Sequence, residues 1–290
     1  MVACRHQPAP PAAQQVLYAS LPAQRTVVIL PIASGPSPAP LAAIRETAPD
    51  VPVDVGSDVR GEIYVANHNG NVKVYAGLNY DYQLVRTIEG PHTRLQHINA
   101  MAVDRGGNIY AADAGAGPGD ARVIVFAGEL NGNVPPDHIL AGPHTGLTSP
   151  AGISIDGTGR VFVADHDSGK VLIFESGAEG DTPPIATIST VRQPVRVLVD
   201  QELNLYVGNA SDHAISVFIP EGSQSWSRSA TISAPAIQNP QGIAVDDSAQ
   251  IAVAVNGGIA FFPSSANGPT APAQFLSGSS PINAAGIMIK

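Results

Sequence analysis

Two oppositely charged residues, Asp54 and Arg196, stand where three related segments of the chain carry glycine, at Gly152, Gly242 and Gly286. An arginine guanidinium can hold a carboxylate or a phosphate through two parallel hydrogen bonds. The pair therefore has two interpretations: an ion pair that ties two parts of the fold together, or an anchor for a polar ligand. If the related segments form a ring, the two side chains face each other across its centre.

A second set of polar residues closes one apolar run in each related segment. An Asx side chain at such a position commonly bonds backbone N–H groups and caps a turn. Carboxylate and amide oxygens that converge on one point also suit Ca²⁺. We expect capped turns, with a calcium site as the alternative. The residues are Ser20, Asn67, Asp113, Asp165 and Asn209, with Val255–Asn256 in the sixth place; Asp113, Asp165 and Asn209 are the predicted metal ligands.

Four of the eight histidines are expected on the same face as these polar residues. A catalytic zinc site would need three of them to converge. The run His166-Asp167-Ser168 is no catalytic triad, because three adjacent residues cannot orient as nucleophile, base and orienting acid. No residue qualifies as catalytic. The four histidines are His68, His97, His166 and His213. The residues predicted to bind a ligand are Asp54, Arg196, Asn67, His97 and His166.

A repeat with a period in the mid-forties must position all of these side chains. Five aspartates mark it, at steps of 46, 52, 44 and 46 residues along the chain. Each follows one apolar run and precedes a second, and two further runs complete the unit. Short runs of β-branched and aromatic residues, bounded by Gly, Pro and Asn, predict strands. Four strands per repeat at this period are typical of a propeller blade. The marker residues are Asp58, Asp104, Asp156, Asp200 and Asp246.

Five full repeats leave two incomplete ends. The segment 285–290 (AGIMIK) matches the innermost strand of a blade, and the segments 16–20, 26–31 and 40–46 match its three partners. The sequence therefore predicts an all-β, six-bladed propeller over residues 16–290. Its last blade joins one C-terminal strand to three N-terminal strands, which removes an open sheet edge.

The phrases PAGISID, VFVAD and VLIF resemble NHL-type repeats, and the connectors GPHTGLTSP (142–150) and EGPHTRLQH (89–97) resemble the blade links of exported bacterial NHL-like proteins. The resemblance covers residues 16–290 and implies the six-bladed fold. It leaves the function open, because propellers of this kind include enzymes, receptors and binding platforms. Six-bladed lactonases, which resemble this chain more loosely, imply calcium near the channel. NHL-type lyases imply a histidine-bound metal.

Composition limits the partners. The formal net charge is −9, with 24 acidic and 15 basic residues, and no Lys/Arg cluster offers a grip on phosphate backbones. We therefore expect no nucleic acid as a partner. No run of about 18 apolar residues predicts a membrane-spanning helix. A monomer is expected.

The N-terminal region predicts export. Cys4, the only cysteine, follows a small residue as in a bacterial lipoprotein signal, and we expect lipidation there. Residues 1–15 are rich in Pro, Ala and Gln, which is typical of an extended tether. The expected location is the periplasm or the cell surface.

The sequence as a whole favours a non-catalytic, exported NHL-like propeller that binds a protein or a small polar ligand at the channel mouth. The alternative is a metal-dependent hydrolase or lyase, lactonase-like or lyase-like, with its site on the same face. No cofactor follows directly from the residues, and calcium is the one candidate.

Overall fold

The computed structural model describes residues 15–32, 35–222, 224–277 and 282–290. Cys4 and all of the predicted tether except Gln15 lie outside these residues. Lipidation, the tether and export therefore stay predictions.

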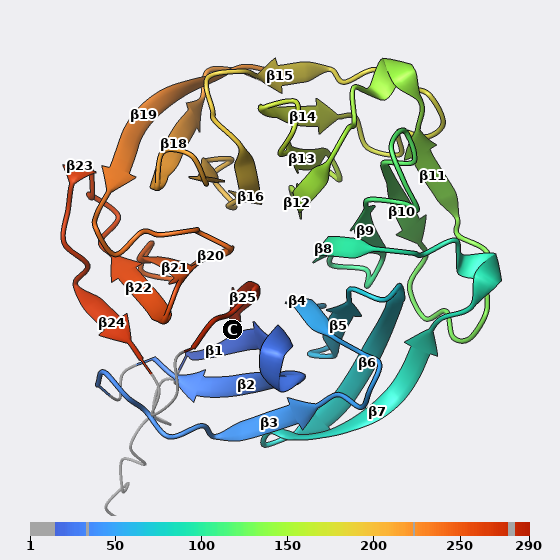
Figure 1. Cartoon of the computed structure of the whole chain (residues 1–290), viewed down its shortest axis with the longest axis horizontal. Helices are drawn as coiled ribbons and strands as arrows, with labels where there is room; N and C mark the ends of the chain where they lie inside the picture. Colours follow the sequence, from blue (N-terminus) through green and yellow to red (C-terminus); the bar gives the residue numbers. More distant parts are fainter. Residues whose placement is uncertain (1–14, 33–34, 223, 278–281) are drawn as a thin grey trace, which may run out of the picture.

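Six sheets stand as blades around a central axis, each with one short strand innermost (Figure 1). Blade 1 contains β4 (Pro52–Ser57), β5 (Ile63–Asn67), β6 (Asn71–Leu78) and β7 (Asp81–Ile88). Blade 2 contains β8 (Ile98–Val103), β9 (Ile109–Asp113), β10 (Arg122–Phe126) and β11 (His138–Ala141). Blade 3 contains β12 (Pro150–Ile155), β13 (Val161–Asp165), β14 (Lys170–Phe174) and β15 (Ala186–Ile188).

The other three blades complete the ring. Blade 4 contains β16 (Pro194–Val199), β17 (Leu205–Asn209), β18 (Ala214–Pro220) and β19 (Trp226–Ser233), with β23 (Gly268–Pro269) paired parallel to β19. Blade 5 contains β20 (Gly242–Val245), β21 (Ile251–Val255), β22 (Gly258–Phe262) and β24 (Gln274–Leu276). Blade 6 contains β25 (Gly286–Ile289), β1 (Val16–Leu21), β2 (Thr26–Pro31) and β3 (Ala42–Arg45). The predicted all-β six-bladed propeller is confirmed.

Blade 6 closes the ring as the repeat predicts. β25 pairs antiparallel with β1, in the register Leu17 to Ile289 and Ser20 to Gly286. Val16 and Lys290 exchange two backbone hydrogen bonds of 3.0 Å at the end of this pairing. The two strands therefore form one continuous ladder, although they lie at opposite ends of the sequence.

The repeated aspartates explain the period of the sequence. Asp104 Oδ1 accepts hydrogen bonds from the backbone N–H groups of Gly106 at 2.8 Å and Asn108 at 2.9 Å. Each such Asx turn links the innermost strand to the second strand of its blade. The other four aspartates accept from the same two positions of their own turns: Asp58, Asp156, Asp200 and Asp246.

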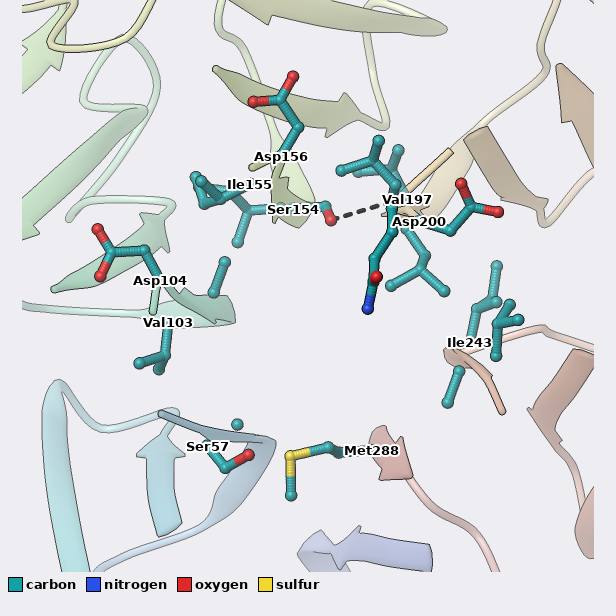
Figure 2. A pocket seen from close by; sticks show the side chains of 18 of the residues that line it. Ser57, Val103, Asp104, Ser154, Ile155, Asp156, Val197, Asp200, Ile243 and Met288 are labelled. Carbon is teal, nitrogen blue, oxygen red and sulfur yellow. Dashed lines mark hydrogen bonds between the residues drawn. The ribbon is translucent and has the colours of Figure 1, made fainter. Parts of the chain in front are cut away.

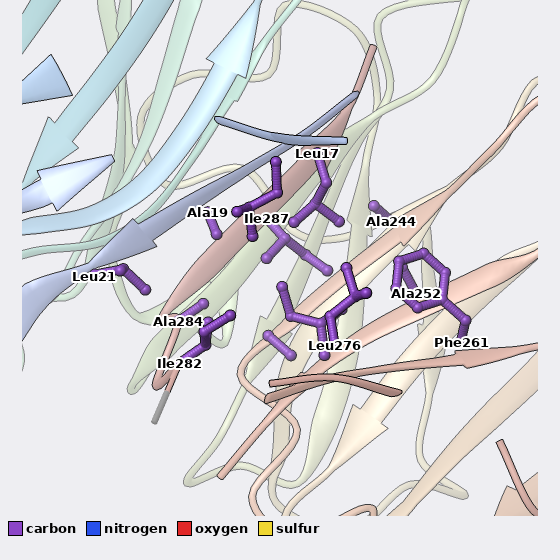
Figure 3. Packing of buried hydrophobic residues seen from close by; sticks show 13 residues of the cluster. Leu17, Ala19, Leu21, Ala244, Ala252, Phe261, Leu276, Ile282, Ala284 and Ile287 are labelled. Carbon is purple, nitrogen blue, oxygen red and sulfur yellow. The ribbon is translucent and has the colours of Figure 1, made fainter. Parts of the chain in front are cut away.

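Apolar side chains fill the spaces between neighbouring blades. Between blades 5 and 6, for example, Ile287 of β25 and Leu17 of β1 pack in one cluster with Phe261 and Leu276 (Figure 3). All four are buried. Such packing holds the innermost strands in place and so positions the walls of the central channel.

Short 3₁₀ helices account for the recurring GPHT phrase. They are η2 (Pro91–Thr93) and η3 (Pro143–Thr145); a third, η1 (Pro22–Gln24), follows β1. In η3 the N–H of His144 donates to Asp181 Oδ1 at 2.7 Å. The glycine before it, Gly142, has φ of 131°, and a Cβ there would lie 2.4 Å from the same oxygen. The phrase is therefore a connector between blades.

Candidate functional site

Asp54 and Arg196 meet across the central channel. They come from β4 and β16, in opposite blades, and Arg196 Nη1 lies 3.3 Å from Asp54 Oδ2. Their side chains are 12% and 11% exposed. The structure therefore brings together the two residues that the sequence places face to face.

The Arg196 guanidinium also bonds a ring of backbone carbonyl oxygens. They belong to the residues just before the position that Arg196 occupies in each repeat, one from each of the other five blades. The acceptors are Val53 at 3.4 Å, Asn99 at 3.5 Å, Ala151 at 3.4 Å, Ala285 at 2.6 Å and Gln241. A guanidinium has five N–H donors, and the three nitrogens of Arg196 all donate. The side chain therefore lies on the axis and closes this end of the channel.

Asp54 is the one charged acceptor in this ring. Burial raises the pKa of Asp54, and the Arg196 charge with the N–H groups of Met101 and Val55 opposes that rise. The two N–H groups donate at 3.0 Å each. A Cβ at Gly286 would lie 2.2 Å from Asp54 Oδ1. The absence of a side chain at Gly286 therefore leaves the space that the Asp54 carboxylate occupies.

In blades 2, 3 and 4 the polar residue at the end of the second strand anchors the loop that leads into the same blade. Asp113 Oδ2 accepts from the N–H of Gln96 at 2.7 Å, and Asp165 Oδ2 accepts from the N–H of Thr148 at 2.8 Å. Asn209 Oδ1 accepts from the N–H of a third such loop. All three side chains are buried. Their oxygens thus have backbone partners, as a capping role requires, and calcium binding by them stays a prediction.

Asn67 departs from this pattern in blade 1. Its Nδ2 donates to Asn71 Oδ1 at 2.9 Å, but its Oδ1 is buried with no hydrogen-bond partner among the described residues. The N–H of Asp50 bonds Thr47 O instead. Asn67 therefore has an unused acceptor on the face where sequence reasoning places the ligand.

The four histidines of this face do not converge on one point. His166 Nδ1 lies 2.6 Å from Asp167 Oδ1 of its own turn. Among the described histidine rings only those of His68 and His97 contact each other, with centroids 5.4 Å apart. Over the described part of the chain, no group of three or more His, Cys, Asp or Glu side chains is placed to hold a metal ion. Ligand binding by His97, His166 and Asn67 stays a prediction.

A cavity of about 1320 Å³ occupies the channel on the other side of Arg196. It runs from the level of Asp54 and Arg196 along all six innermost strands to the turns marked by the repeated aspartates. Figure 2 shows residues of several blades around it, among them Val103, Ile155 and Ile243. None of the histidines in the described part of the chain lines it. The channel is thus closed at one end and open at the other.

Sequence reasoning missed this opening, because it looked for chemistry on the face of the histidines. Three carboxylates at the open end, those of Asp104, Asp156 and Asp200, point away from the channel in Figure 2. Each is used within its own turn. Although burial acts to raise it, hydrogen bonds from Thr158 and Arg160 hold the pKa of Asp156 below its ordinary value. The sequence does contain one indication of this cavity: small and apolar residues recur along each innermost strand.

The comparisons with known proteins identify the fold alone. No protein-family model matches the chain, and no curated protein matches it in sequence. Many solved structures do resemble it. One, of a protein of unknown function from Bacteroides caccae, is 12% identical with a TM-score of 0.68, covering 96% of this chain and 99% of that one. Another, of a functionally unknown protein from Desulfotomaculum acetoxidans, is 18% identical with a TM-score of 0.65, covering 95% and 85%.

A third similar structure is that of a nidogen/laminin complex. A chain of that complex is 14% identical, with a TM-score of 0.71, and the match covers 95% of this chain and 98% of that one. At such identities the likeness carries the propeller architecture and no activity. The described part of the chain contains no helix long and apolar enough to cross a membrane.

Proposed function

We propose that the chain is a non-catalytic, NHL-like binding module whose small ligand enters the central channel from the end opposite Arg196. The observation that carries this proposal is the cavity itself: about 1320 Å³, closed at its inner end and walled by strands of all six blades. Ligand pockets are typically pre-formed hollows of about 300–1,000 Å³. The cavity is large enough for a small molecule.

The walls and the rim together select the ligand. Val103, Ile155, Val197 and Ile243 are apolar and line the cavity. The lining turn residues include six acidic side chains and one basic one. They are Asp104, Asp156, Asp200, Glu202, Asp246 and Asp247, against Arg105. A rim with an excess of negative charge repels anionic ligands. The ligand class is therefore a molecule with an apolar body and a neutral or cationic end.

Three matched probes test this choice of ligand. Benzyl alcohol, benzylamine and benzoate share one ring and differ in charge, and ligand-observed NMR measures their binding to the full chain. We expect the alcohol and the amine to bind at least tenfold more tightly than benzoate at low salt, with the difference shrinking as salt rises. Equal binding of benzoate would overturn the proposed ligand class.

A pair of tryptophan variants tests where the ligand binds. Ser57 lies at the end of β4 and lines the cavity, whereas Ser248 is exposed in a turn at the same end and does not line it. Ser57→Trp should weaken benzylamine binding at least tenfold, and Ser248→Trp should leave it unchanged. If both variants bind as the unaltered chain does, the ligand lies elsewhere, and the predicted site at Asn67, His97 and His166 becomes the next to examine.

A further inference from the structure

His68 and His97 form a pair at the junction of blades 1 and 2, on the end of the propeller remote from the cavity. His68 follows β5, and His97 precedes β8. Their ring centroids are 5.4 Å apart, with an angle of 38° between the planes. Both residues are exposed. Two imidazoles from two blades therefore reach solvent side by side.

Backbone carbonyls fix the protonation of both rings. His68 Nδ1 lies 3.1 Å from Ile98 O, and His97 Nδ1 lies 2.8 Å from Gly115 O. A carbonyl oxygen only accepts, so each Nδ1 must carry the proton and donate. In the neutral ring the other nitrogen, Nε2, then has a free lone pair. This Nδ1–H to carbonyl contact is the usual support of a histidine that binds a metal through Nε2.

The separation of the rings fits one shared ion. With metal–nitrogen bonds of about 2.0–2.1 Å and bond angles of about 90–120°, two imidazoles on one metal have ring centres roughly 4.5–5.5 Å apart. The observed 5.4 Å lies within this range. The carbonyl contacts hold Nδ1 of each ring and leave Nε2 of each ring as the nitrogen that can bind the ion.

We propose that His68 and His97 bind one divalent transition-metal ion, such as Zn²⁺, Ni²⁺ or Cu²⁺, through their Nε2 atoms. Imidazole suits these ions, whereas Ca²⁺ and Mg²⁺ prefer oxygen. Among the described residues no third His, Cys, Asp or Glu joins the pair. The remaining coordination positions belong to water or to a ligand from outside, so the site is open and the ion exchanges. The bound ion ties a loop of blade 1 to a loop of blade 2.

Calorimetric titration with NiCl₂ tests the pair. The full chain, without an affinity tag, carries Cys4→Ser and His6→Gln so that the N-terminal thiol and imidazole do not compete. We expect one equivalent to bind, His68→Gln and His97→Gln each to weaken it at least tenfold, and the double variant to lose no more than either single. His166→Gln is the matched control, because His166 is on the same end and its ring bonds the side chain of Asp167.

Nitrogen-15 NMR of the imidazoles gives a second measurement that needs no variant. Added ZnCl₂, which is diamagnetic, should shift the Nε2 signals of two histidines together and leave their Nδ1–H signals nearly in place. Binding unchanged in His68→Gln or His97→Gln, or an equal loss in His166→Gln, would overturn the proposal, as would a shift of one histidine alone. Calcium chloride is the negative control and should shift no imidazole signal.

Discussion

The two ends of the central channel differ in how their polar groups are used. At one end a single guanidinium occupies the axis and bonds carbonyls of five blades and one carboxylate. At the other end the carboxylates of Asp104, Asp156 and Asp200 point away from the axis and bond their own turns, and the space between the strands stays open. The same repeated strand therefore builds a sealed end and an open one. The difference arises from one substitution, arginine at a position that is glycine or alanine in four other blades.

The largest contrast should come from removing one arginine at each end. Arg196→Ala leaves Asp54 buried without its charged partner, which typically costs about 3–5 kcal/mol of unfolding free energy. Arg105, exposed at the open end, is the control, and Arg105→Ala should change stability by less than about 0.5 kcal/mol. Urea denaturation measures both.

A double variant refines this comparison. Asp54→Ala combined with Arg196→Ala leaves no unpaired charge, so the double variant should recover part of the unfolding free energy lost in Arg196→Ala. Additive losses would mean that the two side chains are independent, and a cost below about 1 kcal/mol for Arg196→Ala would contradict the sealed end altogether.

Glycines at the two ends should respond differently to an added methyl group. A Cβ at Gly286 would meet Asp54 Oδ1 at 2.2 Å, whereas a Cβ at Gly157, which lines the open end, meets nothing within 4 Å. We expect Gly286→Ala to lower the unfolding free energy by about 1–3 kcal/mol through overpacking. Gly157→Ala should be neutral or stabilise by up to about 1 kcal/mol. Equal melting temperatures for the two variants would show that the sealed end is not tightly packed.

The smallest effect, a pH dependence, should have opposite signs at the two ends. The pKa of Asp54 is raised by burial, so the folded state holds its proton longer than the unfolded state does. Its contribution to stability therefore falls as pH rises above the ordinary carboxyl value of about 3.9. The pKa of Asp156 is lowered, so its contribution is complete above about 3.9 and is lost as pH falls below that value.

Comparison with two amide variants isolates the contributions of Asp54 and Asp156 to the pH dependence of stability. The stability of the unaltered chain minus that of Asp54→Asn should decrease from pH 4 to higher pH. The same difference for Asp156→Asn should increase from low pH up to about pH 4 and then level off. Chemical denaturation at closely spaced pH values measures both, and parallel curves would contradict the opposite environments of the two carboxylates.

The sequence predicts the architecture well because every blade repeats the same pattern of strands and turns. The strand pattern, the repeated aspartates and the match of residues 285–290 to an innermost strand each depend on side chains, and side chains are visible in a sequence. The meeting of Asp54 and Arg196 also follows, since six-fold symmetry makes their blades opposite.

Which end of the channel is closed and which is open cannot be predicted from the sequence in the same way. Arg196 bonds mostly backbone carbonyl oxygens. Every residue has a backbone carbonyl, so the residue types do not reveal which ones Arg196 bonds. Which end stays open depends on where one long side chain points. The pairing of His68 with His97 depends likewise on two loops of different lengths, so their histidines could be assigned to a face but not to each other.

The ladder between β1 and β25 sets the order in which the ring can be completed. During synthesis β1, β2 and β3 leave the ribosome first, and their innermost partner leaves only after the other five blades. Until then β1 presents an unpaired edge, the kind of edge that recruits strands from other chains. The same arrangement makes the junction between the two strands a natural place to join the chain covalently, with new termini opened between any two complete blades. A circularly permuted propeller would then close its final blade with a local hairpin in place of its most distant contact.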